Sequence, residues 1–320
     1  MQRILIVRLS AIGDIFHTFT VLTDIKQALP NAKISWLVDA SLSGVAELCP
    51  LIDQVIAIPL RQWKNNKLTY LPNLIKYRQT LINREYDYII DTQGLIKSAA
   101  LARFLFKGSL YGLDKSSARE PLASLFYDFT YKVPQNSIAV IRLRNLISKI
   151  YQLDIDLANP QLLINMKSAT DSIRSPYIFL LYGTSKKSKE WPMAEWIKLA
   201  RWLLENSEYL LTLTYSNSAE QQFAQEFARQ LNQQRVIIIN KMAFSDLADH
   251  INRARLIIGV DTGFTHLANL LAKPTIALYL DSDPAYVGML ESKIAYNLGG
   301  KNKEVSADMV ISTIVAKFKN

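Results

Sequence analysis

Short apolar runs alternate with amphipathic segments along most of the chain. Nine runs of six or seven mostly apolar residues have the length and continuity of strands that are covered on both faces of a sheet. They span residues 4–9, 33–38, 54–60, 86–91, 177–183, 209–215, 235–240, 255–261 and 274–280. Helical spacing of apolar positions is found at 19–29, 95–106, 193–206, 219–232 and 244–254. Strands that alternate with helices predict parallel βαβ units and therefore an α/β fold.

The alternation is interrupted once, between Asn136 and Ser175. There a helical pattern at 137–151 is followed by a polar stretch, which is the best candidate for a linker. The interruption predicts two α/β domains, residues 1–165 and 166–320. The last helical pattern is part of the second domain and is also a candidate to pack back on the first. Ligands of open α/β sheets bind beyond the carboxyl ends of the strands, so we expect the chemistry in the loops that follow the strands, facing a cleft between the domains.

Composition supports a folded protein of two ordinary domains. The chain has 320 residues, of which 49% are hydrophobic, and this excludes a disordered chain. No apolar run approaches the roughly 20 residues that cross a bilayer. The first residues are charged too early for a signal peptide. Cys49 is the single cysteine and excludes an internal disulfide. These features predict a cytoplasmic protein.

Positive charge is concentrated in the first half of the chain. The formal net charge is +9, and residues 1–168 hold 20 lysines and arginines against 13 acidic residues, whereas residues 169–320 hold 17 against 15. Ordinary surface charge is one explanation. The other is that the first half meets something anionic, such as a phosphorylated substrate, an acidic membrane or a nucleic acid. The basic residues are scattered and show no nucleic-acid module, which disfavours the last of these.

The first loop of chemical interest is VRLSAIGDIFHT, residues 7–18. Asp14 follows the first predicted strand, beside Gly13 and at the start of a helical pattern. A carboxylate here can cap the free N–H groups of the helix. It can equally serve as a general base that takes a proton from an attacking hydroxyl. His17, one helical turn on, is better explained as a packing residue.

The second loop is GVDTGFTHLANLL, residues 259–271. Asp261, Thr262 and Gly263 connect an apolar strand to a helix, and His266 lies in the first helical turn. Gly263 lets an anion approach the backbone, and free amides at the helix start favour a diphosphate. The simpler alternative is an Asp/Thr cap with a buried histidine.

Two further loops that follow strands carry residues suited to binding a nucleotide sugar or another anion. GTSKKSKEWP, residues 183–192, combines hydroxyl side chains with three lysines after a strand, either as an anion loop or as a solvated basic loop. Glu220 follows another strand, either as a favourable first-turn acid or as an acceptor of hydrogen bonds from a ribose diol. On the basic half, 91–101 and 117–127 carry cations that could bind an acidic acceptor, although Lys97 could merely extend from its helix to solvent.

These motifs resemble the ADP-heptose lipopolysaccharide heptosyltransferases, glycosyltransferase family 9, and most closely the heptosyltransferase I branch. The resemblance spans about residues 3–284 and includes LIVRLSAIGDIFHT, IDTQGLIKSAAL, AREPLASLFY and VDTGFTHL. It implies a GT-B fold, with two Rossmann-like domains whose parallel sheets face a central cleft. It also implies metal-independent, inverting transfer of L-glycero-D-manno-heptose from ADP-heptose to the inner Kdo sugar of Kdo2-lipid A, in synthesis of the lipopolysaccharide core.

The resemblance also assigns individual residues. Asp14 matches the catalytic base, and Lys189 matches the lysine that binds the diphosphate. The residues that match the donor site are Thr184, Ser185, Lys189, Glu220, Met242, Asp261, Thr262, Gly263 and His266. Those that match the acceptor side are Arg61, Lys64, Gln93, Lys97 and Arg119. No cofactor and no metal is implied beyond the donor, and no nucleic acid. We expect a monomer that is peripheral on the cytoplasmic face of the inner membrane.

Some alternatives and differences accompany this hypothesis. The enzyme could act on a later core acceptor, as heptosyltransferase II does, or the chain could be a nucleotide-binding module without turnover. Where the family has a Gly-Pro-Thr-Asp-Pro run this chain has Leu280–Pro284, and Asp281 with Asp283 spells a D-x-D pattern that is weak evidence for a metal site. The loop before Glu220 also lacks a Gly-Pro-like turn. Basic and aromatic residues at 60–71 and 102–112 predict contact with the membrane surface.

Overall fold

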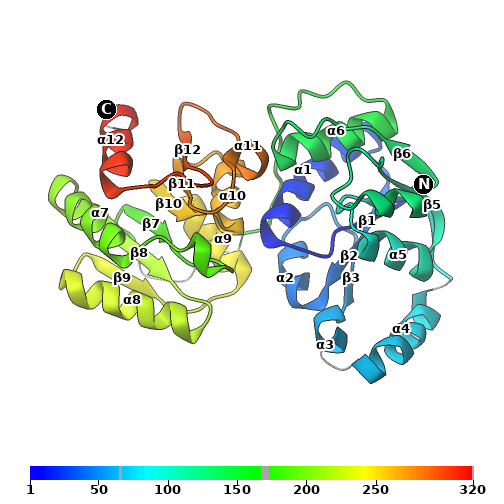
Figure 1. The fold of residues 1–320 in the computed structure, drawn as a ribbon, viewed down its shortest axis with the longest axis horizontal. Helices are drawn as coiled ribbons and strands as arrows, with labels where there is room; N and C mark the ends of the chain where they lie inside the picture. Colours follow the sequence, from blue (N-terminus) through cyan, green and yellow to red (C-terminus); the bar gives the residue numbers. More distant parts are fainter. Residues whose placement is uncertain (65–66, 82, 167–172, 319–320) are drawn as a thin grey trace. The chain divides into compact units, whose positions relative to one another are not determined.

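The computed structural model describes residues 1–64, 67–81, 83–166 and 173–318. Their contacts divide the chain into two compact units, Met1–Asn165 (unit 1) and Met166–Asn320 (unit 2). Each unit contains a six-stranded sheet in which every strand pairing is parallel (Figure 1). The α/β prediction is therefore confirmed.

Unit 1 has the sheet order β3-β2-β1-β4-β5-β6. Its strands are β1 (Arg3–Val7), β2 (Lys33–Asp39), β3 (Gln54–Ile58), β4 (Glu85–Asp91), β5 (Lys107–Leu113) and β6 (Phe129–Tyr131). Its helices are α1 (Ile12–Ala28), α2 (Ser43–Ala46), α3 (Leu60–Lys64), α4 (Lys67–Leu81), α5 (Ile96–Leu105) and α6 (Ala139–Tyr151), with short 3₁₀ turns η1 (Ala40–Leu42) and η2 (Pro121–Phe126). The order reverses between β1 and β4, which makes the end of these two strands the switch point where α/β sheets bind ligands.

Unit 2 repeats this topology with the order β12-β11-β10-β7-β8-β9. Its strands are β7 (Tyr177–Leu181), β8 (Leu210–Thr214), β9 (Val236–Ile239), β10 (Leu256–Val260), β11 (Thr275–Tyr279) and β12 (Ala295–Gly299). Its helices are α7 (Met193–Asn206), α8 (Ser218–Leu231), α9 (Phe244–Arg253), α10 (Gly263–Leu270), α11 (Pro284–Val287) and α12 (Ala307–Lys317), with the 3₁₀ turn η3 (Lys187–Lys189). The switch point of this unit lies between β7 and β10.

All nine predicted strands are present, and three strands were not predicted. β5 contains Gly108, whose φ of +142° and whose distance to Tyr86 leave no room for a side chain, because an added Cβ would lie 2.1 Å from the Tyr86 carbonyl oxygen. Glycine in an apolar run is typical of a turn, so the sequence pattern concealed this strand. β6 has only three residues. In β12 the apolar sequence pattern is interrupted by Asn297, whose side-chain oxygen accepts a hydrogen bond from the Met289 N–H (3.1 Å).

The position of β5 corrects part of the membrane prediction. Residues 102–112 were expected to lie on a membrane surface, but β5 is an interior strand between β4 and β6, and Leu110 is completely buried. Within this segment Phe104 remains exposed, with the Arg78 guanidinium 5.0 Å above its ring centre. In the other segment, 60–71, residues 65 and 66 and the side chains of 64 and 67–70 lie outside the described structure. Among the described helices, none has the length and apolar character needed to span a membrane.

The segment predicted as a linker is largely part of unit 1. The helical pattern at 137–151 forms α6, which packs on α1. A buried ion pair joins the two helices, because both Arg144 Nε and Nη2 donate to the Asp24 carboxylate at 2.8 Å. Residues 152–165, which follow α6, also belong to unit 1, and the Asn165 N–H donates to the Leu48 carbonyl (2.7 Å).

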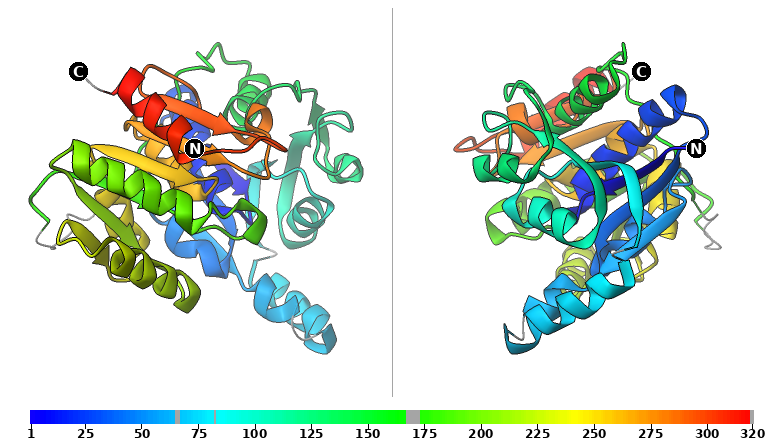
Figure 2. Two further views of the ribbon diagram at one scale, coloured as in Figure 1. Left: turned by 60° about the vertical axis from the view of Figure 1, so that its left-hand side comes forward. Right: turned by 90° about the vertical axis from the view of Figure 1, so that its right-hand side faces the viewer.

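The C-terminal helix packs within unit 2. Whether it also returns to the first domain stays a prediction; within its own unit the structure places α12 against α7 (Figure 2, left). The Glu195 carboxylate of α7 accepts the Ala307 N–H at 2.5 Å, and Val310 and Ile314 are buried in the core between the sheet, α7 and α8.

Candidate active site

Asp14 lies at the carboxyl edge of the unit 1 sheet, in the first turn of α1. Its Oδ2 accepts a long hydrogen bond from the Ala11 N–H (3.4 Å), and its Oδ1 lies 3.7 Å from Arg8 Nη2. A third of the Asp14 side chain (34%) is exposed, whereas the Arg8 side chain is 7% exposed. The carboxylate therefore caps the helix weakly and can still be reached by a substrate hydroxyl. His17 is buried, as a packing residue would be.

A second loop at the same edge is organised by Asp91, the last residue of β4. Asp91 is completely buried. Its Oδ1 accepts the Gln93 and Gly94 N–H groups (2.8 and 3.3 Å), and its Oδ2 accepts the hydroxyls of Ser98 and Tyr127 (2.7 and 2.8 Å). One carboxyl group thus connects the β4–α5 turn to the end of η2. Burial raises the pKa of Asp91, although these hydrogen bonds oppose that shift.

The predicted acceptor residues are distributed along this edge. Gln93 accepts the Leu9 N–H through Oε1 (2.9 Å) and so joins the β4 loop to the β1 loop that leads to Asp14. Lys97 is an exposed residue of α5, and Arg119 is exposed in the loop after β5. That loop is tied to the β4 loop, because the Glu120 N–H donates to the Gly94 carbonyl (3.0 Å).

The other two predicted acceptor residues follow β3. Arg61 is largely exposed, with Nε 3.9 Å from Asp39 Oδ1 at the end of β2. Lys64 is the last residue of α3, and its side chain lies outside the described part of the structure. Because all these strands are parallel, the loops that carry Arg61, Asp14, Gln93 and Arg119 leave the same edge of the sheet.

In unit 2 the switch point holds a cluster around Asp261, directly after β10. Lys189 Nζ, from the loop after β7, donates to Asp261 Oδ2 at 2.5 Å, and His266 Nε2 lies 3.5 Å from Oδ1. Ser282, from the loop after β11, donates through its hydroxyl to Asp261 Oδ2 (2.6 Å). Burial alone would raise the pKa of Asp261, but the bonds from His266, Lys189 and Ser282 hold that pKa well below its usual range. Asp261 therefore remains negatively charged at neutral pH and fixes the position of Lys189.

The helix start beside this cluster has the geometry expected for anion binding. Thr262 is the N-cap of α10 in extended conformation, and Gly263 is the first helical residue. At the strand end, Gly259 lets the helix approach closely, because an added Cβ would lie 2.3 Å from Thr265 Oγ1. Thr265 in turn donates to the Val260 carbonyl (2.8 Å). The amide end of α10 and its positive dipole are thereby held next to Lys189.

Glu220, Thr184 and Met242 extend the same edge toward β8 and β9. Glu220 lies in the first turn of α8, and its Oε2 accepts the Ser216 N–H (2.7 Å). Its Oε1 is so close to the Gly183–Thr184 loop that a Cβ on Gly183 would lie 2.8 Å away. Thr184 Oγ1 is buried and has no hydrogen-bond partner among the described residues. Ser185 is exposed in the same loop, and Met242 is half-buried after β9.

The D-x-D pattern serves local structure. Asp281 Oδ2 accepts the Ser188 hydroxyl (2.6 Å), and Asp283 caps α11 by accepting the Ala285 N–H (2.9 Å). Ser282 between them is the residue that contacts Asp261. Within the described residues, no group of three or more His, Cys, Asp or Glu side chains is placed to hold a metal ion.

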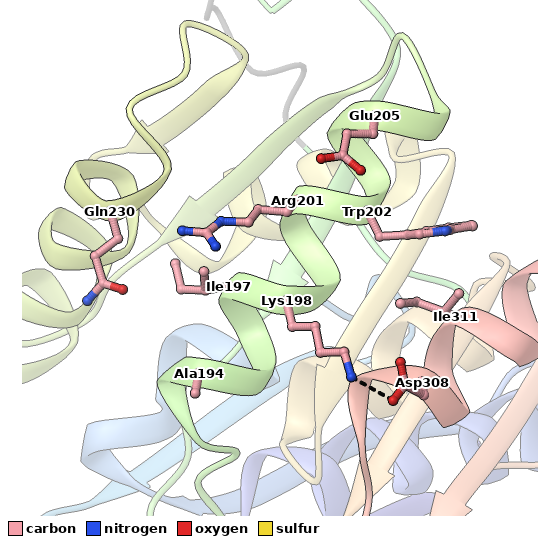
Figure 3. A pocket seen from close by; sticks show the side chains of 9 residues that line it. All are labelled: Ala194, Ile197, Lys198, Arg201, Trp202, Glu205, Gln230, Asp308 and Ile311. Carbon is pink, nitrogen blue, oxygen red and sulfur yellow. Dashed lines mark hydrogen bonds and ion pairs between the residues drawn. The ribbon is translucent and has the colours of Figure 1, made fainter.

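Three positions next to the predicted site residues were not singled out by sequence reasoning. Ser282 was considered only as the middle of D-x-D, and Asp91 and Arg8 only as parts of quoted motifs. Asp91 is the last residue of β4, Arg8 follows β1 by one residue, and Ser282 follows β11 by three. This location at the carboxyl end of a parallel strand is the signal that could have identified them. A hollow of about 520 Å³ on the outer face of α7 and α12 contains none of the predicted site residues (Figure 3). Lys198 Nζ donates to Asp308 across it at 2.6 Å.

Comparisons with known proteins show the family of this chain. The sequence model of glycosyltransferase family 9 (heptosyltransferase) matches residues 74–315. Lipopolysaccharide heptosyltransferase 1 of Escherichia coli is 33% identical over 298 residues, covering 90% of each chain. The Pseudomonas aeruginosa protein of the same name is 32% identical over 290 residues, covering 90% of this chain and 81% of that protein.

Solved structures extend the likeness to the whole fold. The E. coli heptosyltransferase WaaC, solved with ADP, superposes with a TM-score of 0.84 at 29% identity and covers 98% of this chain and 99% of its own. The same enzyme was solved with ADP-2-deoxy-2-fluoro heptose. With two Rossmann-like units of the GT-B class and a family match over most of its length, this chain belongs to glycosyltransferase family 9, the heptosyltransferases.

Proposed function

We propose that the protein transfers L-glycero-D-manno-heptose from ADP-heptose to the inner Kdo sugar of Kdo2-lipid A, with inversion at the anomeric carbon. The observation that carries the proposal is the contact of Lys189 with Asp261 at the switch point of unit 2. A fixed cation beside a helix N-terminus is what a sugar diphosphate requires. The E. coli relative solved with ADP and with a fluorinated ADP-heptose supports this choice of donor.

The donor site proposed here consists of the unit 2 loops. Lys189, Thr184 and Ser185 would bind the diphosphate together with the amides at Thr262 and Gly263, while Asp261 and His266 hold Lys189 and the loop in place. Glu220 would accept hydrogen bonds from the ribose hydroxyls, and Met242 would lie beside the adenine.

Asp14 is the proposed general base in unit 1. The carboxylate takes the proton of the acceptor hydroxyl, and the hydroxyl oxygen forms a bond to the anomeric carbon of heptose. The bond from that carbon to the diphosphate oxygen breaks on the opposite face, and ADP leaves with the bonding electrons. The acceptor is proposed to lie among Arg61, Lys64, Gln93, Lys97 and Arg119. The reaction requires the two units to bring these groups together.

Charge on the departing ADP would be stabilised by Lys189 and by the dipole of α10. These groups supply positive charge without an ion, and on that ground we propose that the transfer needs no metal and no cofactor. The proposed enzyme works as a monomer, and its partner is the lipid acceptor.

A peripheral position on the cytoplasmic face of the inner membrane is part of the proposal, because the acceptor is a lipid. Two exposed leucines support it. Leu122 and Leu125 of η2 are 57% and 78% exposed, three and six residues after Arg119. Leu71 and Ile75 of α4 are also exposed. α4 packs on α5 and α5 packs on η2, so these apolar side chains belong to neighbouring elements of the basic unit.

The test is an assay with ADP-heptose and Kdo2-lipid A in the presence of a chelator. We expect release of ADP together with a lipid that is heavier by one heptose. Kdo2-lipid A that already carries one heptose and lipid A without Kdo serve as comparison acceptors. Preferred use of the heptosylated acceptor would assign the enzyme to a later step, turnover abolished by the chelator would contradict metal independence, and binding of ADP without any transfer would identify a nucleotide-binding module.

A further inference from the structure

Arg8, whose Nη2 lies 3.7 Å from Asp14 Oδ1, and Arg142, which lies within the electrostatic influence of Arg8, are two arginines that the reaction scheme above does not use. Arg8 follows β1 by one residue, and Arg142 is the fourth residue of α6. The carboxyl edge of the unit 1 sheet carries both, since α6 begins after the parallel strand β6. Arg142 Nη2 donates to the carbonyl of Ser117, two residues before Arg119 (2.9 Å).

Both guanidinium groups keep buried hydrogen-bonding capacity. Arg8 is 6% exposed, yet its Nε–H has no hydrogen-bond partner among the described residues, and the same is true of the buried Nε–H of Arg142. A buried N–H donor without a partner has lost its hydration without compensation, and this is more unfavourable when the group is charged. Such a loss in both arginines indicates that a group absent from the folded chain satisfies them.

The charges around the two arginines also favour an anionic ligand. Arg142 lies in the first turn of α6, where the helix dipole disfavours a cation. Burial lowers the pKa of Arg142, and the nearby positive charge of Arg8 lowers it further. Among the described residues, the carboxylate within 4 Å of Arg8 is Asp14, at 3.7 Å, and Arg142 has none. Arg8 and Arg142 thus carry two positive charges, and Asp14 supplies one negative charge next to Arg8, so one additional negative charge would balance the three groups.

We infer that Arg8 and Arg142 bind the carboxylate of the acceptor's sugar acid and thereby hold the neighbouring hydroxyl against Asp14. This inference rests on the proposed function. The planar N–H fork of arginine matches a carboxylate in two-point geometry. The anion must also belong to the reacting sugar, because Arg8 is buried directly beside the base, whereas the phosphates of lipid A are on other sugars.

The first test measures KM for Kdo2-lipid A in Arg8→Gln and Arg142→Gln. Each loses a charge-assisted hydrogen bond, so the acceptor KM should rise about 10- to 100-fold, while the KM for ADP-heptose and the affinity for ADP stay unchanged. Arg84→Gln is the matched control, because Arg84 precedes β4 at the opposite edge of the same sheet. An acceptor KM that stays at the wild-type value in both variants overturns the inference.

The second test identifies the anion by changing the acceptor. A carboxamide at the inner Kdo should raise the KM of the wild-type enzyme and abolish the difference between wild type and each variant. A difference that persists with the carboxamide but disappears with dephosphorylated lipid A would assign the arginines to a phosphate instead. The comparison of the two acceptors with the wild-type enzyme needs no variant. It therefore tests whether the carboxylate is recognised even if Arg8→Gln fails to fold. Failure of wild type to use Kdo2-lipid A at all would refute the proposed function separately.

Discussion

Asp14 is placed to act on a hydroxyl rather than only to cap a helix. Its hydrogen bond to the Ala11 N–H is long (3.4 Å), and a third of the side chain is exposed. Arg8 Nη2 lies 3.7 Å from its Oδ1, so the carboxylate has a cation beside it as well as access to solvent.

Asp14→Asn should therefore lower kcat by about 10²- to 10⁴-fold, the usual contribution of a positioned base. The amide keeps the shape of the carboxylate but cannot take up the proton. Binding of ADP, measured by calorimetry, should be unaltered, because the proposed donor site is in unit 2. Turnover near the wild-type rate would remove Asp14 from the role of base.

Lys189 differs from its neighbours in the same loop. It is fixed by Asp261, whereas Lys186 and Lys187 are exposed. Lys189→Ala should weaken ADP binding by about 10- to 100-fold, because it removes a charge-assisted contact with the diphosphate. Lys186→Ala and Lys187→Ala are the controls in the same calorimetric titration. Equal, small effects of all three substitutions would show that the loop contributes only general positive charge.

At the scale of elements, Asp91 connects several segments at the carboxyl edge of the unit 1 sheet. It accepts four hydrogen bonds, from Gln93 and Gly94 in the β4–α5 turn, from Ser98 in α5 and from Tyr127. The turn carries Gln93, and α5 carries Lys97, so Asp91 determines where two proposed acceptor residues lie. Burial makes its ionised form costly, which is why the pKa of Asp91 is raised.

This raised pKa predicts a pH dependence of stability. Below the ordinary value of about 3.9 the carboxyl is protonated in both states. As the pH rises, the unfolded chain releases this proton first, so the free energy of unfolding falls until the pH exceeds the raised pKa of the folded state. Asp91→Asn removes this contribution and should gain stability relative to wild type as the pH rises through that range. Urea denaturation across the range measures the difference.

The control for this experiment is Asp87→Asn, on the same strand but exposed. If the stability difference between Asp91→Asn and wild type does not change with pH, the pKa of Asp91 is not raised in the folded state. A higher KM for the acceptor in Asp91→Asn would in addition show that the conformation of the β4–α5 turn depends on the carboxyl group.

At the scale of the whole molecule, the same strand order occurs twice, once in each unit. Each unit has its own core and its own switch point, and the proposed base and the proposed diphosphate site occupy the two switch points. The units differ in charge, because the first half of the chain holds most of the positive excess. This difference fits the proposal that unit 1 binds the anionic lipid acceptor and unit 2 binds the nucleotide donor.

The charge and the exposed leucines together predict binding to anionic membranes. Replacement of Leu122 and Leu125 by Asp should reduce association with phosphatidylglycerol vesicles about tenfold or more, since it removes apolar burial and adds repulsion. Flotation of the vesicles measures the effect. Val315→Asp, at an exposed position of α12 in unit 2, is the control. Equal flotation of the double variant and the wild type would exclude η2 as the membrane contact.

The class of the fold could be predicted from the amino-acid pattern alone, and most residues of the candidate site could be proposed from it. Buried parallel strands are continuously apolar, so ILIV and LIIGV could be recognised locally, and the residues directly after them could be proposed as functional. Local patterns could not identify β5, because Gly108 is required there by a close backbone approach that depends on Tyr86 of another strand.

Which of these loops come into contact could be learned only from the folded chain. Lys189 and Asp261 are 72 residues apart in sequence, and they pair because β7 and β10 are neighbours in a sheet whose order is not the order of the chain. Ser282 joins them from the loop after β11 for the same reason. Likewise, the buried Nε–H groups of Arg8 and Arg142, which have no hydrogen-bond partner among the described residues, could be identified only from the packed structure. Periodicity reports which face of an element is buried, but contacts between distant loops depend on strand order and helix packing, which no local pattern encodes.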